Sequence, residues 1–222
     1  NSKTKKGKYF KDKTGSKNSI PPMGILLRAV FICMATVSVQ ARPVSYPGGS
    51  TLMAFSDNAK NALYYHYSPT HKYSLGIEIL EDRYREEDYS YLRFTYLLNR
   101  KNTEKSQRNL YFQSGVSTDG LRNHFYGIHG DWETRRWYAG FGAKQIKSQK
   151  PSLTDTFFQL GIAPYLGEYG DFHTWLMLKT RKNSLDGDWH SYPVLKVFKG
   201  KTLLELGYSK NAYWDVHLMH RF

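Results

Sequence analysis

Downstream of Pro47-Gly48-Gly49 the chain consists of short runs in which apolar and polar residues alternate. A period of two residues is typical of a β-strand with one apolar face. Turn-forming residues such as Asp57-Asn58, Asp119-Gly120 and Asp186-Gly187 separate the runs. The pattern predicts twelve strands, at about residues 50–56, 61–68, 72–81, 89–99, 108–117, 124–134, 136–146, 155–164, 171–181, 189–198, 202–209 and 212–222.

Each predicted strand has an apolar face that carries no charge. In the run 72–81 this face consists of Tyr73, Leu75, Ile77 and Ile79. Charged residues fall on the opposite faces, and they include Lys72, Glu78, Arg93, Asp131, Glu133, Lys144, Lys179, Lys196, Glu205, Asp215 and Arg221. A soluble β-sandwich would turn these charged faces to water, whereas a transmembrane barrel turns the apolar faces to lipid.

Three features favour the membrane barrel over the sandwich. The runs have the length that a tilted transmembrane strand needs. Tyr and Trp gather near strand ends, where an aromatic girdle would lie. Glycines recur on the charged faces, as crowding inside a small barrel would demand, at Gly76, Gly115, Gly127, Gly140, Gly142, Gly161 and Gly207. The expected fold is an all-β, antiparallel up-and-down transmembrane β-barrel of about 12 strands, with 8 or 10 as alternatives.

The segment 23–41 has the features of a secretory signal peptide. Arg28 precedes an apolar stretch from Ala29 to Val39, and small or slim residues then lead to Ala41. The expected cleavage follows Ala41, which leaves 42–222 as the barrel. The Lys-rich segment 1–22 is expected to be a disordered basic extension or to lie upstream of a true start at Met23.

Composition narrows the class of protein further. Tyr, Phe and Trp make up 16% of the 222 residues, and the mean hydropathy of −0.61 excludes a helical membrane protein. The net charge of +13 is unevenly placed, since residues 1–41 hold seven Lys and Arg28 against the single acid Asp12 and so carry +7 of it. No nucleic-acid motif follows, so nucleic-acid binding is not expected. Cys33, the single cysteine, lies in the signal segment, so disulfide and thiol chemistry are not expected.

The last strand, AYWDVHLMHRF, resembles the C-terminal signature of Gram-negative outer-membrane barrel proteins. Phe222, Leu218, Val216 and Trp214 match its alternating apolar positions, while His220 departs from them. The resemblance implies an outer-membrane location and recognition of this strand by the barrel assembly machinery. The stretch ALYYHYSPTHKYSLGIE is faintly similar to small uncharacterised barrels that accompany copper and heavy-metal export systems.

An even number of strands places both termini on one side, expected to be periplasmic. The outer loops are then expected at 57–60, 82–88, 118–123, 147–154, 182–188 and 210–211. Outer-membrane lipid is the expected surrounding, and no cofactor is expected.

Candidate chemistry lies on the charged faces. The expected lumen-lining residues are Glu78, Arg93, Asp131, Glu133, Lys144, Lys179, Lys196, Glu205, Asp215 and Arg221. His66, His129, His173 and His217 also point inward in this scheme and are weaker metal candidates, since imidazole suits copper or zinc. His129 with Asp131 has the spacing of an oriented general base, but ordinary charge pairing in a polar interior is the stronger explanation.

The sequence therefore favours a non-enzymatic barrel for passage or binding of a small solute or metal ion in the cell envelope, with a link to metal resistance as a further expectation. The alternatives are a structural or adhesion barrel, and an outer-membrane enzyme acting on lipid or peptide.

Overall fold

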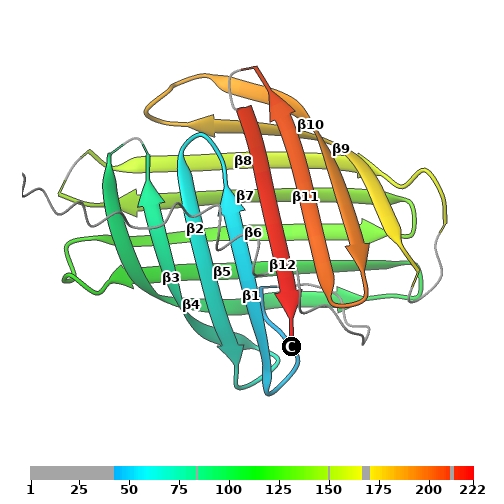
Figure 1. Cartoon of the computed structure of the whole chain (residues 1–222). Helices are drawn as coiled ribbons and strands as arrows, with labels where there is room; N and C mark the ends of the chain where they lie inside the picture. Colours follow the sequence, from blue (N-terminus) through cyan, green and yellow to red (C-terminus); the bar gives the residue numbers. More distant parts are fainter. Residues whose placement is uncertain (1–42, 84, 150, 167–170, 211–212) are drawn as a thin grey trace, which may run out of the picture. The chain divides into compact units, whose positions relative to one another are not determined.

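The computed structural model describes residues 43–83, 85–149, 151–166, 171–210 and 213–222. These residues form twelve antiparallel strands that close into a barrel (Figure 1), and no helix among them is long and apolar enough to cross a membrane. The strands are β1 (Gly49–Ser56), β2 (Lys60–Ser68), β3 (Tyr73–Asp82), β4 (Glu87–Asn102), β5 (Ser106–Ser117), β6 (His124–Thr134), β7 (Trp137–Lys147), β8 (Leu153–Ile162), β9 (His173–Asn183), β10 (Trp189–Lys199), β11 (Thr202–Ser209) and β12 (Tyr213–Arg221). The predicted fold class is confirmed, and the strand number is twelve rather than eight or ten.

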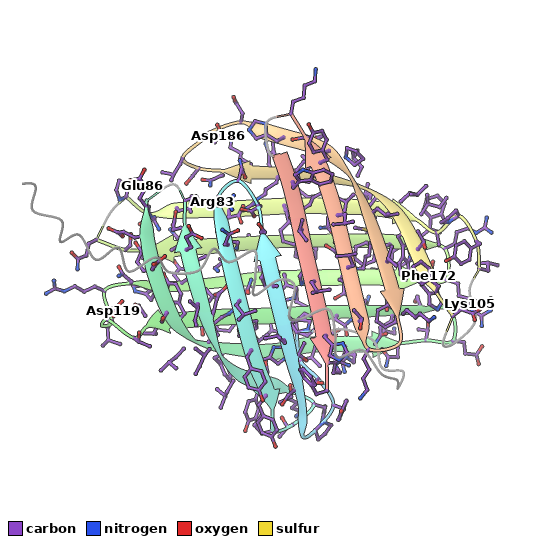
Figure 2. All side chains as sticks on the ribbon, viewed as in Figure 1. Arg83, Glu86, Lys105, Asp119, Phe172 and Asp186 are labelled. Atoms are coloured by element: carbon purple, nitrogen blue, oxygen red, sulfur yellow. The ribbon has the colours of Figure 1, made fainter. Side chains whose placement is uncertain are left out.

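The topology is up-and-down, because every strand pairs with its neighbours in the chain and β1 closes the barrel against β12. Thr51 lies opposite Arg221, so the start of β1 and the end of β12 are at the same end of the barrel. We call this the terminal end and the opposite one the distal end. Figure 2 labels loop residues from both: Arg83, Glu86, Asp119 and Asp186 at the distal end, Lys105 and Phe172 at the terminal end.

Alternate residues of each strand point to opposite faces of the barrel wall. On β3, Leu75, Ile77 and Ile79 are 51%, 52% and 59% exposed on the outer face, whereas Glu78 between them is 1% exposed on the inner face. The register carries this division around the barrel, since Ile77 lies opposite both Tyr65 of β2 and Leu92 of β4. Exposed apolar side chains also lie on the outer face of other strands, such as Tyr65 of β2, Ile128 of β6 and Trp214 of β12.

Some strand boundaries differ from the expected ones. β4 runs from Glu87 to Asn102 rather than over 89–99, and its pairing with β5 shifts between Leu97 and Asn99. Such a bulge adds one residue to one strand and interrupts strict alternation. The periodicity therefore stops at about the bulge, although the strand continues beyond it as a polar segment.

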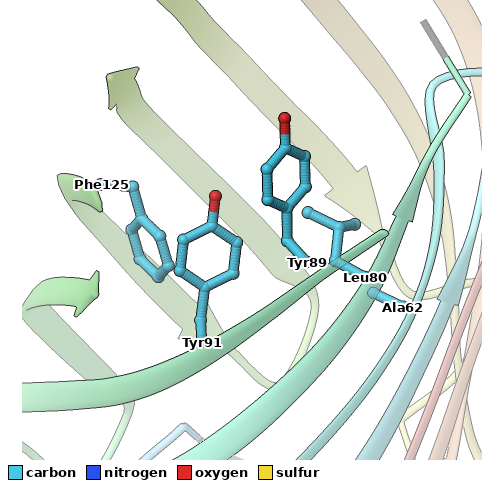
Figure 3. Close-up of a cluster of buried hydrophobic side chains, with 5 residues drawn as sticks. All are labelled: Ala62, Leu80, Tyr89, Tyr91 and Phe125. Carbon is cyan, nitrogen blue, oxygen red and sulfur yellow. The ribbon is translucent and has the colours of Figure 1, made fainter. Parts of the chain in front are cut away.

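Large side chains from non-adjacent strands meet inside the barrel. Figure 3 shows one such cluster, in which Tyr89 and Tyr91 of β4 pack with Ala62 of β2, Leu80 of β3 and Phe125 of β6. The rings of Tyr91 and Phe125 are 5.3 Å apart in an edge-to-face arrangement. The inner face is therefore packed with aromatic side chains between its charges.

The predicted signal peptide at 23–41 and the basic segment 1–22 lie outside the described residues and stay predictions. The described strands run from Gly49 to Arg221, and the predicted barrel bounds of 42–222 stay a prediction.

Candidate functional site

The centre of the inner wall holds a buried ion pair between β3 and β4. Gly76 lies opposite Arg93 in the β3–β4 register, which brings Glu78, two residues along β3, within reach of the guanidinium. Arg93 Nη1 is 3.1 Å from Glu78 Oε2, and Arg93 Nη2 donates a hydrogen bond of 2.9 Å to Gln113 Oε1 of β5. The guanidinium carbon also lies 4.0 Å from the centre of the Tyr64 ring. One arginine thus joins four adjacent strands.

A second cation faces the same aromatic cluster. Lys144 Nζ of β7 lies 3.8 Å from the centre of the Phe125 ring, which Arg93 approaches at 5.2 Å. Cation–π contacts of this kind strengthen where water is excluded. Arg93 and Lys144 therefore form a positively charged surface around Phe125, with Glu78 as the neighbouring anion.

On the opposite wall, acids and lysines pair between β9, β10, β11 and β12. Lys179 Nζ is 2.5 Å from Asp215 Oδ2, which also accepts a hydrogen bond of 2.7 Å from the Tyr192 hydroxyl. Lys196 of β10 and Glu205 of β11 lie opposite each other in the register, and Lys196 Nζ is 3.2 Å from Glu205 Oε1. These contacts place alternating charges along the inner face of this wall.

Near the distal end, Arg181 of β9 holds two carboxylates. Its Nη1 donates to Asp57 Oδ2 at 2.7 Å, and its Nε donates to Asp155 Oδ1 at 2.7 Å. Asp57 belongs to the β1–β2 turn, so this contact joins β9 to a turn four strands away around the wall. Burial alone would raise the pKa of Asp57. The charges of Arg181 and Lys60 and the hydrogen bonds from Arg181 and the Ala59 N–H together outweigh burial and lower the pKa to about 2.

A small cavity opens beside Arg181, Asp57 and Asp155, here called the Arg181 triad. Its volume is about 30 Å³, enough for about two ordered waters. It is lined by Asp57, Asn58, Ala59, Arg181, Asn183, Asp186, His190, Tyr192 and Asp215. Every acid in the lining has a basic or hydroxyl partner, as Asp186 has in His190 at 2.6 Å.

The Asp57→Asn substitution tests the charge of the triad. Because folding lowers the Asp57 pKa from 3.8 to about 2, the carboxylate stabilises the fold above pH 4, and this contribution is lost as pH falls from about 4 to 2. At about 1.4 kcal/mol per pKa unit, it amounts to roughly 2 kcal/mol. We expect the difference in unfolding free energy between wild type and variant to be largest at pH 5 and to shrink towards pH 2. A difference that is constant over this range would contradict the lowered pKa.

The inner face contains all of the charged residues proposed as lumen lining. The structure brings three pairs of them together: Glu78 with Arg93, Lys179 with Asp215, and Lys196 with Glu205. Asp131 accepts a hydrogen bond of 2.8 Å from Asn109. The remaining positions are Glu133 on β6, Lys144 on β7 and Arg221 on β12. Their role in passage stays a prediction.

The four candidate histidines also lie on the inner face but on four different strands. Each packs against an aromatic ring: His66 on Tyr64, His129 on Tyr111, His173 on Trp175 and His217 on Phe55. Among the described residues, no group of three or more His, Cys, Asp and Glu side chains is placed to hold a metal ion. The metal role of these histidines therefore gains no support from their arrangement and stays a prediction.

His129 and Asp131 each contact another residue of the inner face. The His129 ring stacks on Tyr111 at 4.8 Å, whereas Asp131 is bonded to Asn109. The general-base arrangement therefore gains no support from these contacts.

Sequence reasoning missed two sets of residues that shape this interior. The Arg181 triad was missed because alternation gives the face of a residue but not its partner across the barrel. The inner aromatic residues Tyr64, Tyr111, Phe125 and Tyr192, each at most 2% exposed, were not recognised as filling the lumen. The available signal was that each of these aromatic residues lies an even number of residues from polar or charged positions of the same strand, and so on the same face.

Comparison with known proteins shows a likeness in fold only. No family model and no curated protein matches the chain. Among solved structures, it is similar to the "KdgM porin in complex with disordered oligogalacturonate", with a TM-score of 0.48, 11% identity, and coverage of 78% of this chain and 99% of that chain. It is similar to a second structure, "KdgM porin", with a TM-score of 0.47, 11% identity and the same coverage of 78% and 99%.

Proposed function

We propose that this protein is an outer-membrane β-barrel that lets a small polar solute pass through, or bind within, its charged interior. The observation that carries the membrane location is the apolar outer face of the closed wall. Large apolar side chains are more than half exposed there, such as Ile77 and Leu92 on β3 and β4 and Leu160 and Leu178 on β8 and β9. A soluble protein rarely exposes so much contiguous apolar surface.

Charge on the outer face is confined to strand ends. By the register, the charged outer-face residues of the described strands are Glu81, Asp88, Lys147 and Lys182 towards the distal end and Lys101, Arg108 and Lys199 towards the terminal end. This distribution fits a hydrocarbon band with polar rims, because a charge costs most at mid-bilayer and little near the interface. We take the terminal end to be periplasmic, the signal to be cleaved after Ala41, and the last strand to be read by the assembly machinery.

The polarity of the interior supports a role for a polar solute. Replacing a buried ion pair by apolar side chains is often neutral or stabilising, so a barrel that serves only as a scaffold gains little from ion pairs. This interior nevertheless carries Glu78–Arg93, Lys179–Asp215 and Lys196–Glu205. Nothing in their arrangement favours a metal ion over other small solutes.

A purely structural barrel is the second candidate. The burial of Tyr64, Tyr91, Tyr111 and Phe125 favours it, because these rings occupy space that a wide channel would leave open. If solute passes, it is therefore small, and side chains move to admit it.

Reconstitution tests both parts of the proposal. Outer-membrane fractions are run unboiled and boiled on a detergent gel, and the purified barrel is inserted into planar bilayers. A band that shifts on boiling, together with discrete conductance steps, supports passage. A shifting band with no conductance and no swelling of vesicles in small sugars supports the structural barrel, and a soluble protein without a shift refutes the membrane location.

The Ile77→Arg substitution tests the lipid-facing wall directly. Ile77 is 52% exposed in the middle of the outer face of β3, so we expect the arginine to destabilise the barrel in phospholipid vesicles by about 2–4 kcal/mol. Glu81→Arg, on the same face at the strand end, is the matched control, with an expected cost of about 0–1 kcal/mol. Denaturant titration of vesicle-inserted protein gives both values. Equal costs for the two variants would argue against a bilayer around β3.

A further inference from the structure

The segment Pro43–Tyr46, here called the strap, precedes β1 and folds into the terminal end of the barrel (Figure 1, blue). Val44 is 2% exposed and packs against Leu97 of β4 and Tyr111 of β5, which are both inner-face residues. The strap therefore covers the inner wall where β2 to β5 reach the terminal end. It does not continue the barrel wall, which begins at Gly49.

Two serines of the inner wall bind the backbone of the strap. The Ser74 hydroxyl of β3 donates a hydrogen bond of 3.0 Å to the Pro43 carbonyl, and the Ser45 N–H donates one of 2.9 Å to Ser68 Oγ of β2. Both wall serines are fully buried. A small hydroxyl side chain at each position leaves room for the strap and gives its backbone a partner.

A glycine turn makes the fold-back possible. The Gly49 N–H donates to the Tyr46 carbonyl at 2.9 Å, and Gly48 has a φ of 82°, which favours glycine. A Cβ on Gly49 would lie 2.6 Å from Ser45 Oγ, so a larger residue there would displace the Ser45 side chain. The Tyr46 hydroxyl donates to the Phe222 carbonyl at 2.5 Å, which ties the turn to the end of β12.

The strap is held far less firmly than the strand that follows it. From Gly49 onward, β1 is paired with β2 on one side and with β12 on the other. The strap has one buried apolar side chain, the tethers named above, and a Ser45 hydroxyl that is buried without a hydrogen-bond partner. An unpartnered buried hydroxyl opposes the docked position.

We propose that the strap is a gate, which closes the terminal end when docked on Ser68, Ser74, Leu97 and Tyr111 and opens it by swinging about Gly48. This inference rests on the proposed passage of a small solute. It adds a state of the barrel in which the inner wall of β2–β5 is accessible from the terminal end.

Thiol labelling measures the movement without relying on passage. In a Cys33→Ser background, Ser74→Cys places one thiol under the strap and Ser117→Cys places one on the inner wall at the distal end of β5. Val44→Asp puts a charge in the apolar seat and should raise the labelling rate of Cys at 74 by a membrane-impermeant maleimide about tenfold, equivalent to about 1.4 kcal/mol in the docking equilibrium. The rate at 117 should not change. Equal acceleration at both positions, or at neither, would overturn the gate.

A reversible lock then tests whether the movement controls passage. The double variant Ser45→Cys/Ser68→Cys in the same background joins strap to wall, and conductance is compared before and after reduction. A rise on reduction supports the gate. Conductance that is equal in both states shows that passage exists but the strap does not control it, which overturns the inference alone. A third outcome is that no variant conducts although Val44→Asp still accelerates labelling at position 74. This outcome rejects the proposed passage and with it the role of the strap as a solute gate.

Discussion

Glu78→Gln should destabilise the barrel by about 3–5 kcal/mol, the cost of leaving one partner of a buried ion pair without its counter-charge. Glu78 is 1% exposed and lies 3.1 Å from Arg93, whose other contacts are the neutral Gln113 and aromatic rings. Lys144 adds a second positive charge on the same aromatic cluster. Glutamine keeps the size of the side chain, so the loss reports charge rather than packing. Denaturant unfolding of the barrel in vesicles at neutral pH gives the difference.

The double variant Glu78→Gln/Arg93→Met is the matched control for this result. It removes both charges, and replacement of a whole buried pair by uncharged groups is often close to neutral. We therefore expect the double variant to recover most of the stability that the single variant loses, with a coupling energy well above the few tenths expected of independent sites. If Glu78→Gln costs less than 1 kcal/mol, water reaches the pair and the centre of the barrel is wetter than the packing of Tyr64 and Phe125 indicates.

The assignment of residues to faces was predictable because it depends only on parity within a strand. Ile77 and Glu78 are neighbours, and a register slip of one residue would put the glutamate on the outer face and the isoleucine in the interior. The cost of such a slip on every strand fixes the register, so alternation in the sequence is enough to recover it. This is why the closed barrel and its apolar outer face followed from the sequence.

Partnerships across the barrel were not predictable in the same way. Arg181 and Asp57 are 124 residues apart, and their contact depends on the tilt and stagger of all intervening strands. The same holds for the histidines, which share the inner face but are separated on β2, β6, β9 and β12. Residues that share a face of the wall need not lie close enough to form one site. The metal hypothesis required the histidines to form one site.

The strap was not predicted because it has no periodicity to read. Val44 is a single apolar residue between Pro43 and Ser45, and nothing in that pattern distinguishes an inward-folded segment from a linker. Its position depends on small side chains elsewhere, at Ser68 and Ser74, which are ordinary polar positions in their own strands.

Gly76→Ala should be among the most damaging single changes in the wall, although it adds only a methyl group. A Cβ at this position would lie 2.2 Å from the Tyr65 carbonyl oxygen and 2.7 Å from the His66 Cβ, both belonging to β2. Neither atom is the free end of a flexible side chain, so β2 and β3 must move apart where Gly76 pairs with His66. Overpacking of this kind costs about 1–3 kcal/mol and occasionally more, and we expect the upper end here.

Gly140→Ala is the matched control, the same substitution on the same inner face. The nearest atoms to a Cβ there belong to the Tyr138 ring and hydroxyl, at 3.0 Å or more, and this ring turns aside by a small side-chain rotation. Alanine also restricts the unfolded chain more than glycine does, which offsets the remaining crowding by about 0.5–1 kcal/mol. We therefore expect Gly140→Ala to be close to neutral in vesicle unfolding. If the two variants lose equal stability, glycine serves strand flexibility on the inner face in general, and the close approach of β2 to β3 is not what requires Gly76.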